Sequence, residues 1–330
     1  MDLPLLSASF LAFALTLYVI LDGFDLGVGI LLLLQPAMPS RDHMVDSITP
    51  TWDGNETWII MAGVTVLAAF PVAYAILLPA LYLPVIFMLL ALGFRGVSFE
   101  FRVQTKRHRR RCDIAFAAGS IVAAFMQGLI LGGLMQGVRV QNLHFAGSVL
   151  DIFRPLPVIS GVTLVLGYAV LGGGWLKLKS NLSVQQFASR CLRVSTPLFA
   201  VLFGIVCIYA VNIQPSIRSE WMSHRIALPC LVGLFAVLAA TLTALAKKSR
   251  PTMPFFLGLL LFVVGISGIA LIVFPNIVPF SLSLWDAASS STSQKFVLIG
   301  AALVTPVVLL YSGFAYWIFR GRTPENGWGE

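Results

Sequence analysis

The stretch that decides the fold is LLSASFLAFALTLYVILDGFDLGVGILLLL (residues 5–34), an almost unbroken apolar run. About 20 apolar residues are enough for a helix to cross the hydrocarbon core of a bilayer. The run therefore predicts a transmembrane helix, although Asp22 and Asp25 interrupt it. A carboxylate inside a bilayer costs about 2.5 to 3.5 kcal/mol on insertion scales, so each needs a partner, water or a proton. These two aspartates are the first candidates for function.

The rest of the chain repeats this apolar pattern. Hydrophobic residues make up 58% of the 330 positions and charged residues only 11%, whereas soluble domains contain about 45 to 50% apolar residues. The predicted spans are residues 5–34, 57–76, 77–99, 114–138, 156–176, 196–213, 226–246, 254–275 and 296–319. We expect an all-α, polytopic membrane protein with about nine transmembrane helices, forming a single integral membrane domain over residues 1–330. The second and third spans share one apolar run, in which Pro71, Pro79 and Pro84 predict a turn.

The distribution of charge predicts the orientation of the chain. Most of the 22 lysine and arginine residues follow the first, third, fifth, seventh and ninth spans. Because cytoplasmic connections carry an excess of basic residues, the N-terminus should lie outside and the C-terminus in the cytoplasm. The densest basic run, residues 106–111, is interpreted as an anchor for topology and lipid headgroups. A nucleic-acid partner is not expected.

A second acidic motif, Trp52-Asp53-Gly54-Asn55-Glu56, opens the second span. In the predicted topology the first helix runs inward and the second starts from the cytoplasmic side. The pair Asp22 and Asp25 should therefore meet the pair Asp53 and Glu56 in the cytoplasmic half of the membrane. Each pair is spaced i, i+3, which places its two carboxylates on one helix face.

Arg95 and Glu100 should reach the same side from the third span. Arg95 is the expected partner of an aspartate, because its guanidinium binds carboxylates through a rigid fork and stays charged. The functional interpretation is a proton entry path, in which buried carboxylates load from the cytoplasm and pass protons inward. The structural alternative is that Asp53 caps a helix and that Arg95 only balances a buried charge. Glu56 fits either role.

The spans offer no evident ligand for a metal. All four histidines fall in connections, so no span supplies an imidazole for haem or copper. The histidines are His43, His108, His144 and His224. Methionines within spans, such as Met61 and Met88, are interpreted as packing residues. We therefore expect no metal site in this chain, and any redox metal should belong to another chain.

Five motifs now carry a resemblance to a known family. They are LDGFDLGVG (residues 21–29), WDGNETW (52–58), AFPVAY (69–74), FRGVSFEFR (94–102) and LWDAASS (284–290). In this order, and over essentially the whole chain, they resemble subunit II of the cytochrome bd-type quinol oxidases. The compact length is similar to that of the cyanide-insensitive branch.

The resemblance implies a terminal oxidase of the bacterial cytoplasmic (inner) membrane, which oxidises quinol and reduces oxygen to water with protons from the cytoplasm. It implies two four-helix bundles plus a peripheral helix, and a partner, subunit I, that holds haems b and d and the quinol site. In this family subunit II can hold a structural quinone, and small accessory membrane subunits are possible partners. The family's proton path falls on Asp53, Asp22 and Asp25, while Glu56 stands where glutamine is common.

Two other functions stay open. A proton-coupled secondary transporter would also use membrane carboxylates, but it should show an internal repeat and a midplane site, and the sequence shows neither. A purely structural subunit would tolerate neutral replacements of Asp53 and Asp22.

Overall fold

The computed structural model describes residues 2–105, 107–248 and 250–324. Nine long helices appear in this part of the chain: α1 (Leu3–Leu32), α3 (Trp52–Ala69), α5 (Tyr82–Gln104), α6 (Arg109–Gln136), α7 (Pro155–Lys179), α8 (Leu182–Ile213), α10 (Ala227–Leu245), α11 (Met253–Val273) and α12 (Ser291–Ile318). The shorter elements are α2 (Met38–Asp46), α4 (Pro71–Ala80), α9 (Pro215–Ser223), the 3₁₀ helix η1 (Val149–Phe153), and the strands β1 (Val140–Gln141), β2 (His144–Phe145), β3 (Asn276–Val278) and β4 (Leu282–Ser283). The strands form two small antiparallel hairpins, β1–β2 and β3–β4. The prediction of an all-α chain is confirmed.

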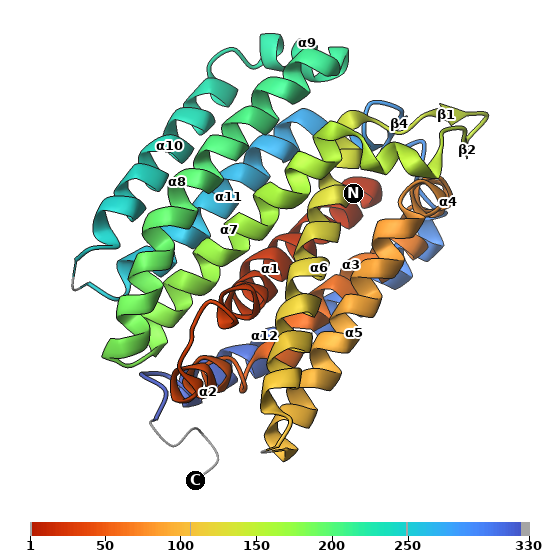
Figure 1. Cartoon of the computed structure of the whole chain (residues 1–330). Helices are drawn as coiled ribbons and strands as arrows, with labels where there is room; N and C mark the ends of the chain where they lie inside the picture. The colour runs from red at the N-terminus through yellow and green to blue at the C-terminus, as the bar shows by residue number, and fades with distance from the viewer. Residues whose placement is uncertain (1, 106, 249, 325–330) are drawn as a thin grey trace.

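The long helices form two groups of four (Figure 1). One group contains α1, α3, α5 and α6, and the other contains α7, α8, α10 and α11. Helices α1 and α6 pack against α7 where the groups meet, while α12 lies outside, against α3 and α1. Among the described helices, eight are long and apolar enough to cross a membrane. The ninth long helix, α3, has 18 residues and carries Asp53 and Glu56 in its opening turns.

The predicted boundary between the second and third spans is wrong. It falls between residues 76 and 77, whereas α3 already ends at Ala69 and α4 occupies Pro71–Ala80. Pro71 lies in the first turn of α4, where its missing N–H would have no intrahelical partner in any case. The apolar run is thus divided before Pro71 and again at Leu81, so α5 begins at Tyr82.

Glycines allow α1, α6 and α7 to approach backbone to backbone. A Cβ atom added at Gly27 would lie 1.9 Å from the carbonyl oxygen of Tyr168, and one at Gly172 would lie 2.2 Å from the Gly27 carbonyl carbon. Likewise, a Cβ at Gly128 would lie 2.6 Å from the Cα of Gly161. Small residues at such contacts are typical of helix packing in membranes. These contacts hold α1 in the middle of the molecule.

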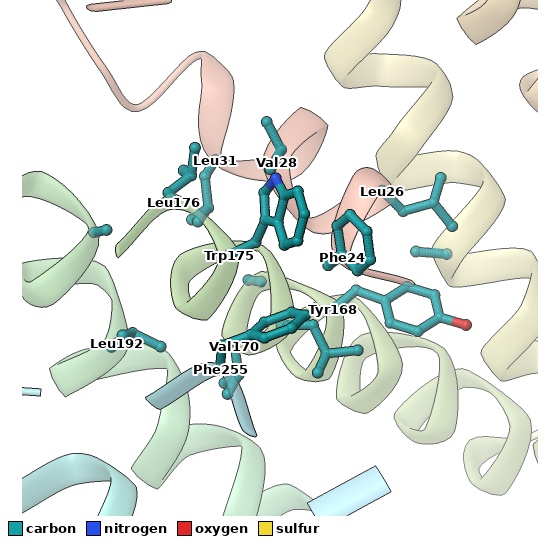
Figure 2. Close-up of a cluster of buried hydrophobic side chains, with 14 of the residues drawn as sticks. Phe24, Leu26, Val28, Leu31, Tyr168, Val170, Trp175, Leu176, Leu192 and Phe255 are labelled. Carbon is teal, nitrogen blue, oxygen red and sulfur yellow. The ribbon is translucent and has the colours of Figure 1, made fainter. Parts of the chain in front are cut away.

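Aromatic residues hold the C-terminal half of α1 in place (Figure 2). Phe24 stacks on Trp175 of α7 with ring centroids 4.3 Å apart, and Phe255 of α11 lies 5.3 Å from Trp175. The indole nitrogen of Trp175 donates a hydrogen bond to the carbonyl oxygen of Ser47, just after α2. Since Phe24 lies between the two aspartates of α1, this packing sets the position of both carboxylates.

Candidate functional site

Three helices meet at one buried arginine. Arg95 of α5 places its Nη2 atom 2.8 Å from Oδ1 of Asp22 on α1, and its Nη1 atom 3.3 Å from Oε1 of Glu56 on α3. The side chains of Arg95 and Asp22 are 0% exposed, and that of Glu56 is 23% exposed. An arginine stays charged in such surroundings. The arrangement is therefore an ion triad that is enclosed at Asp22 and partly exposed at Glu56.

Asp25 is held by neutral groups instead. The amide nitrogen of Asn55 donates to Oδ2 of Asp25 at 2.7 Å, and the hydroxyl of Tyr316 on α12 donates to the amide oxygen of Asn55 at 3.1 Å. The other oxygen of Asp25 is buried and has no hydrogen-bond partner among the described residues. Asp25 thus lies beside the ion triad, and its contacts tie α12 to α1 through α3.

Asp53 and Glu100 lie at the surface. Both side chains are exposed, and neither forms an ion pair or a side-chain hydrogen bond within the described ranges. Asp53 belongs to the first turn of α3, whose N-cap is Thr51, so it is not itself the N-cap residue. It precedes Glu56 by one helical turn. Three acids therefore follow one another from the surface inward: Asp53 is exposed, Glu56 is partly buried and Asp22 is enclosed.

Two residues of this site were not predicted. Asn55 lies inside the WDGNETW motif, and a side-chain amide in an apolar helix is a signal for an interhelical hydrogen bond. Tyr316 stands 261 positions further along the chain. Nothing in the local sequence indicates that its hydroxyl reaches this amide.

A second ion network lies at the C-terminal end of α5, where Arg102 belongs to the last turn. Arg102 places nitrogens 2.6 Å from Asp42 of α2 and 2.6 Å from Asp113 of α6. Arg109 also pairs with Asp42, at 3.1 Å, and Arg41 lies 3.5 Å from Asp113. These pairs join the short helix α2 to α5 and α6.

The network changes the interpretation of the basic run at residues 106–111. Arg109 pairs with a carboxylate of the same chain, so it is not a free anchor for lipid headgroups. Lys106 lies outside the described residues. Nearby, at the end of α2, partial burial raises the pKa of the Asp46 carboxyl above its ordinary value, although the charge of Arg102 opposes this. Asp46 is thus a surface acid that binds a proton more readily than usual.

The described residues offer no grouped metal ligands in the long apolar helices. None of the four histidines lies in a helix long and apolar enough to span. His43 is buried on α2, where its Nε2 atom accepts a hydrogen bond from the backbone of Asn181 at 3.2 Å. In the ranges that the structure describes, no three His, Cys, Asp or Glu side chains are grouped so that they could hold a metal ion.

Comparison with known proteins identifies the family. Residues 3–319 match the family model described as cytochrome bd terminal oxidase subunit II. Subunit 2 of the cytochrome bd-I ubiquinol oxidase of Escherichia coli K12 is 28% identical over 351 residues, covering 94% of this chain and 92% of that protein. Subunit 2 of the Bacillus subtilis cytochrome bd ubiquinol oxidase is 27% identical over 323 residues, with coverages of 94% and 93%. The structure of the bd oxidase from Geobacillus thermodenitrificans shares the fold, with a TM-score of 0.73 over 97% of this chain and 98% of that chain at 12% identity. This chain belongs to the cytochrome bd terminal oxidase subunit II family.

Proposed function

We propose that this chain is the metal-free subunit of a membrane complex that oxidises quinol and reduces oxygen to water. Its family, and the names of its curated relatives as ubiquinol oxidase subunits, support this reaction. Since none of the four histidines lies in a long apolar helix, we assign the haems b and d to a partner, subunit I, where they supply the oxygen chemistry. The contribution of this chain is a path for protons. No observation favours a secondary transporter.

The observation that carries the proton path is the inward succession Asp53, Glu56, Asp22. Asp53 exchanges protons with water at the surface, and Glu56 lies one turn further along α3, at the edge of the guanidinium of Arg95. The ion triad and Asp25 together contain three carboxyl groups but only one cation. If all were ionised, two uncompensated negative charges would be enclosed, which is costly in an apolar interior. Proton uptake relieves this excess, so the site is suited to accept protons from the surface acid.

The proposed orientation of the chain in the membrane rests on the basic residues at the end of the molecule where this path opens. Helix α2 and the C-terminal end of α12 lie at one end, while α9 and the hairpin β1–β2 lie at the other (Figure 1). The end with α2 also carries Arg102, Lys177 and Lys179. By the excess of basic residues it is the cytoplasmic end, so the N-terminus is periplasmic, the C-terminus is cytoplasmic, and the chain resides in the bacterial inner membrane. The structural quinone, the small accessory subunits and the cyanide-insensitive branch stay predictions.

The test uses Asp53→Asn and Glu56→Gln in the assembled complex. Both variants should lower quinol-dependent oxygen consumption by about tenfold or more, because a positioned acid or base contributes at least that much to proton transfer. The haem content and the visible spectrum should stay normal. Glu220→Gln, at a partly exposed acid on α9 at the opposite end, is the matched control. Normal turnover in both acid variants would leave Asp53 and Glu56 as structural residues only.

A further inference from the structure

A chain of three polar side chains, two of them buried and one partly buried, leads to Asp22 of the ion triad. The hydroxyl of Tyr168 on α7 donates to the amide oxygen of Gln127 on α6 at 2.7 Å. The amide nitrogen of Gln127 donates to the hydroxyl oxygen of Tyr18 on α1, also at 2.7 Å. Tyr18 is 2% exposed and Tyr168 0%. Two hydrogen bonds thus join three helices in the interior, where the path proposed above assigns them no role.

The direction of these hydrogen bonds leaves the hydroxyl proton of Tyr18 without an acceptor in this chain of side chains. The hydroxyl of Tyr18 accepts from Gln127, so its own O–H is available to another acceptor. Asp22 follows Tyr18 by four residues on α1, which places the two side chains on the same helix face. Helix side chains also lean toward the N-terminus, so the carboxylate of Asp22 leans toward Tyr18.

The carboxylate of Asp22, in turn, lacks a hydrogen-bond donor among the described residues. Neither of its oxygens accepts a hydrogen bond of normal geometry within the described part of the chain, although Arg95 forms an ion pair with Oδ1. Its charge interacts with the hydroxyls of both Tyr18 and Tyr168. A buried carboxylate without a donor is costly. The unused donor and the unused acceptor are therefore one helical turn apart.

We propose that Tyr18 is a positioning residue for Asp22, whose carboxylate it binds through its hydroxyl while Gln127 and Tyr168 hold that hydroxyl in place. Asp22 then lies between a fixed cation from α5 and a neutral donor from its own helix. A neutral donor supports the ionised carboxylate but leaves no uncompensated charge when the carboxylate takes up a proton. The inference rests on the proposed function, because it assigns Tyr18 to the proton-binding acid at the inner end of the path.

The test is Tyr18→Phe in the complete complex, which removes only the hydroxyl. The Asp22 carboxyl band is first identified in infrared difference spectra as the band lost in Asp22→Asn. In Tyr18→Phe the pH at which this band is half titrated should shift by about one pH unit, a tenfold change in proton affinity, since a hydrogen bond to a charged group is lost. The pH profile of oxygen consumption should shift with it. Tyr168→Phe should produce a smaller shift in the same direction, and Tyr82→Phe, at an exposed tyrosine at the start of α5, should produce none.

The outcomes separate this inference from the proposed function. If Asp22→Asn lowers turnover while Tyr18→Phe leaves both the band and the pH profile unchanged, the inference is wrong and the proton path stands. If neither variant changes turnover or the pH profile, both are wrong. If Tyr18→Phe loses its haem, Gln127→Met takes its place, because it removes the support of Tyr18 without altering α1. An unshifted band in Gln127→Met would then overturn the inference.

Discussion

Replacing Arg95 by methionine should destabilise the folded chain, because it removes the cation that pairs with Asp22. Methionine fills a similar space but carries no charge. Arg95 is 0% exposed and lies 2.8 Å from Asp22 and 3.3 Å from Glu56. Its loss would leave the enclosed carboxylate of Asp22 without a cation, whereas the partial exposure of Glu56 reduces the effect there.

The magnitude follows from this difference in burial. Removing one partner of a buried ion pair costs about 3 to 5 kcal/mol. At 1.36 kcal/mol for each factor of ten, this corresponds to about two to four powers of ten in the folding equilibrium. The double variant Arg95→Met/Asp22→Asn removes both charges, so most of this loss should be recovered. The double variant should nevertheless turn over slowly, because the inner proton acceptor is gone.

The assay is thermal unfolding of the purified complex, followed through the haem absorption, together with haem content and quinol-dependent oxygen consumption. The two single variants and the double variant form a cycle that isolates the coupling between Arg95 and Asp22. Arg111→Met is the matched control, because Arg111 is exposed on α6 and forms no ion pair in the described residues. A single variant Arg95→Met as stable as the parent, or a double variant no more stable than the single one, would refute the reasoning.

Two further predictions concern packing and helix ends. Gly27→Ala should prevent stable assembly, because its Cβ would lie 1.9 Å from a backbone oxygen of Tyr168. Gly63→Ala should be neutral, because a Cβ atom there would have nothing within 4 Å. The haem content of the purified complex distinguishes the two variants. Lys177→Met should lower the thermal midpoint by an amount equivalent to about 1 to 3 kcal/mol without changing turnover per haem, because the lysine donates to three carbonyl oxygens at the end of α10. Lys295→Met, at an exposed lysine of α12, should leave the midpoint unchanged, and an equal loss in both lysine variants would contradict the capping role.

Hydropathy predicted the class of this protein because the bilayer constrains length and composition directly. It could not locate the break between α3 and α4, since both sides of Phe70 are equally apolar. The missing N–H of Pro71 was the available signal, and a helix that begins with proline marks the end of the helix before it. The pairing of Arg95 was predictable for a similar reason, because a charged residue within an apolar run requires a partner inside the membrane.

The neutral parts of the site could not be predicted in the same way. Gln127 and Tyr18 are 109 positions apart, and Tyr316 and Asn55 are 261 positions apart. Each contact depends on how two helices are rotated about their own axes. That rotation is determined by the packing of whole helix faces, so a local motif does not contain it.

The buried acids and the glycines of α1 belong to one physical arrangement. All eight residues from 22 to 29 are buried, so this part of α1 is enclosed on every side of the helix. Such enclosure is possible because a side chain at Gly23 or Gly27 would collide with Tyr168, and one at Gly29 would collide with Ser120 of α6. The close approach that excludes solvent from Asp22 also brings the ring of Tyr168, and with it the hydrogen bonds to Gln127, next to the carboxylate. The motif LDGFDLGVG therefore creates both the need for charge compensation and the polar neighbours that supply it.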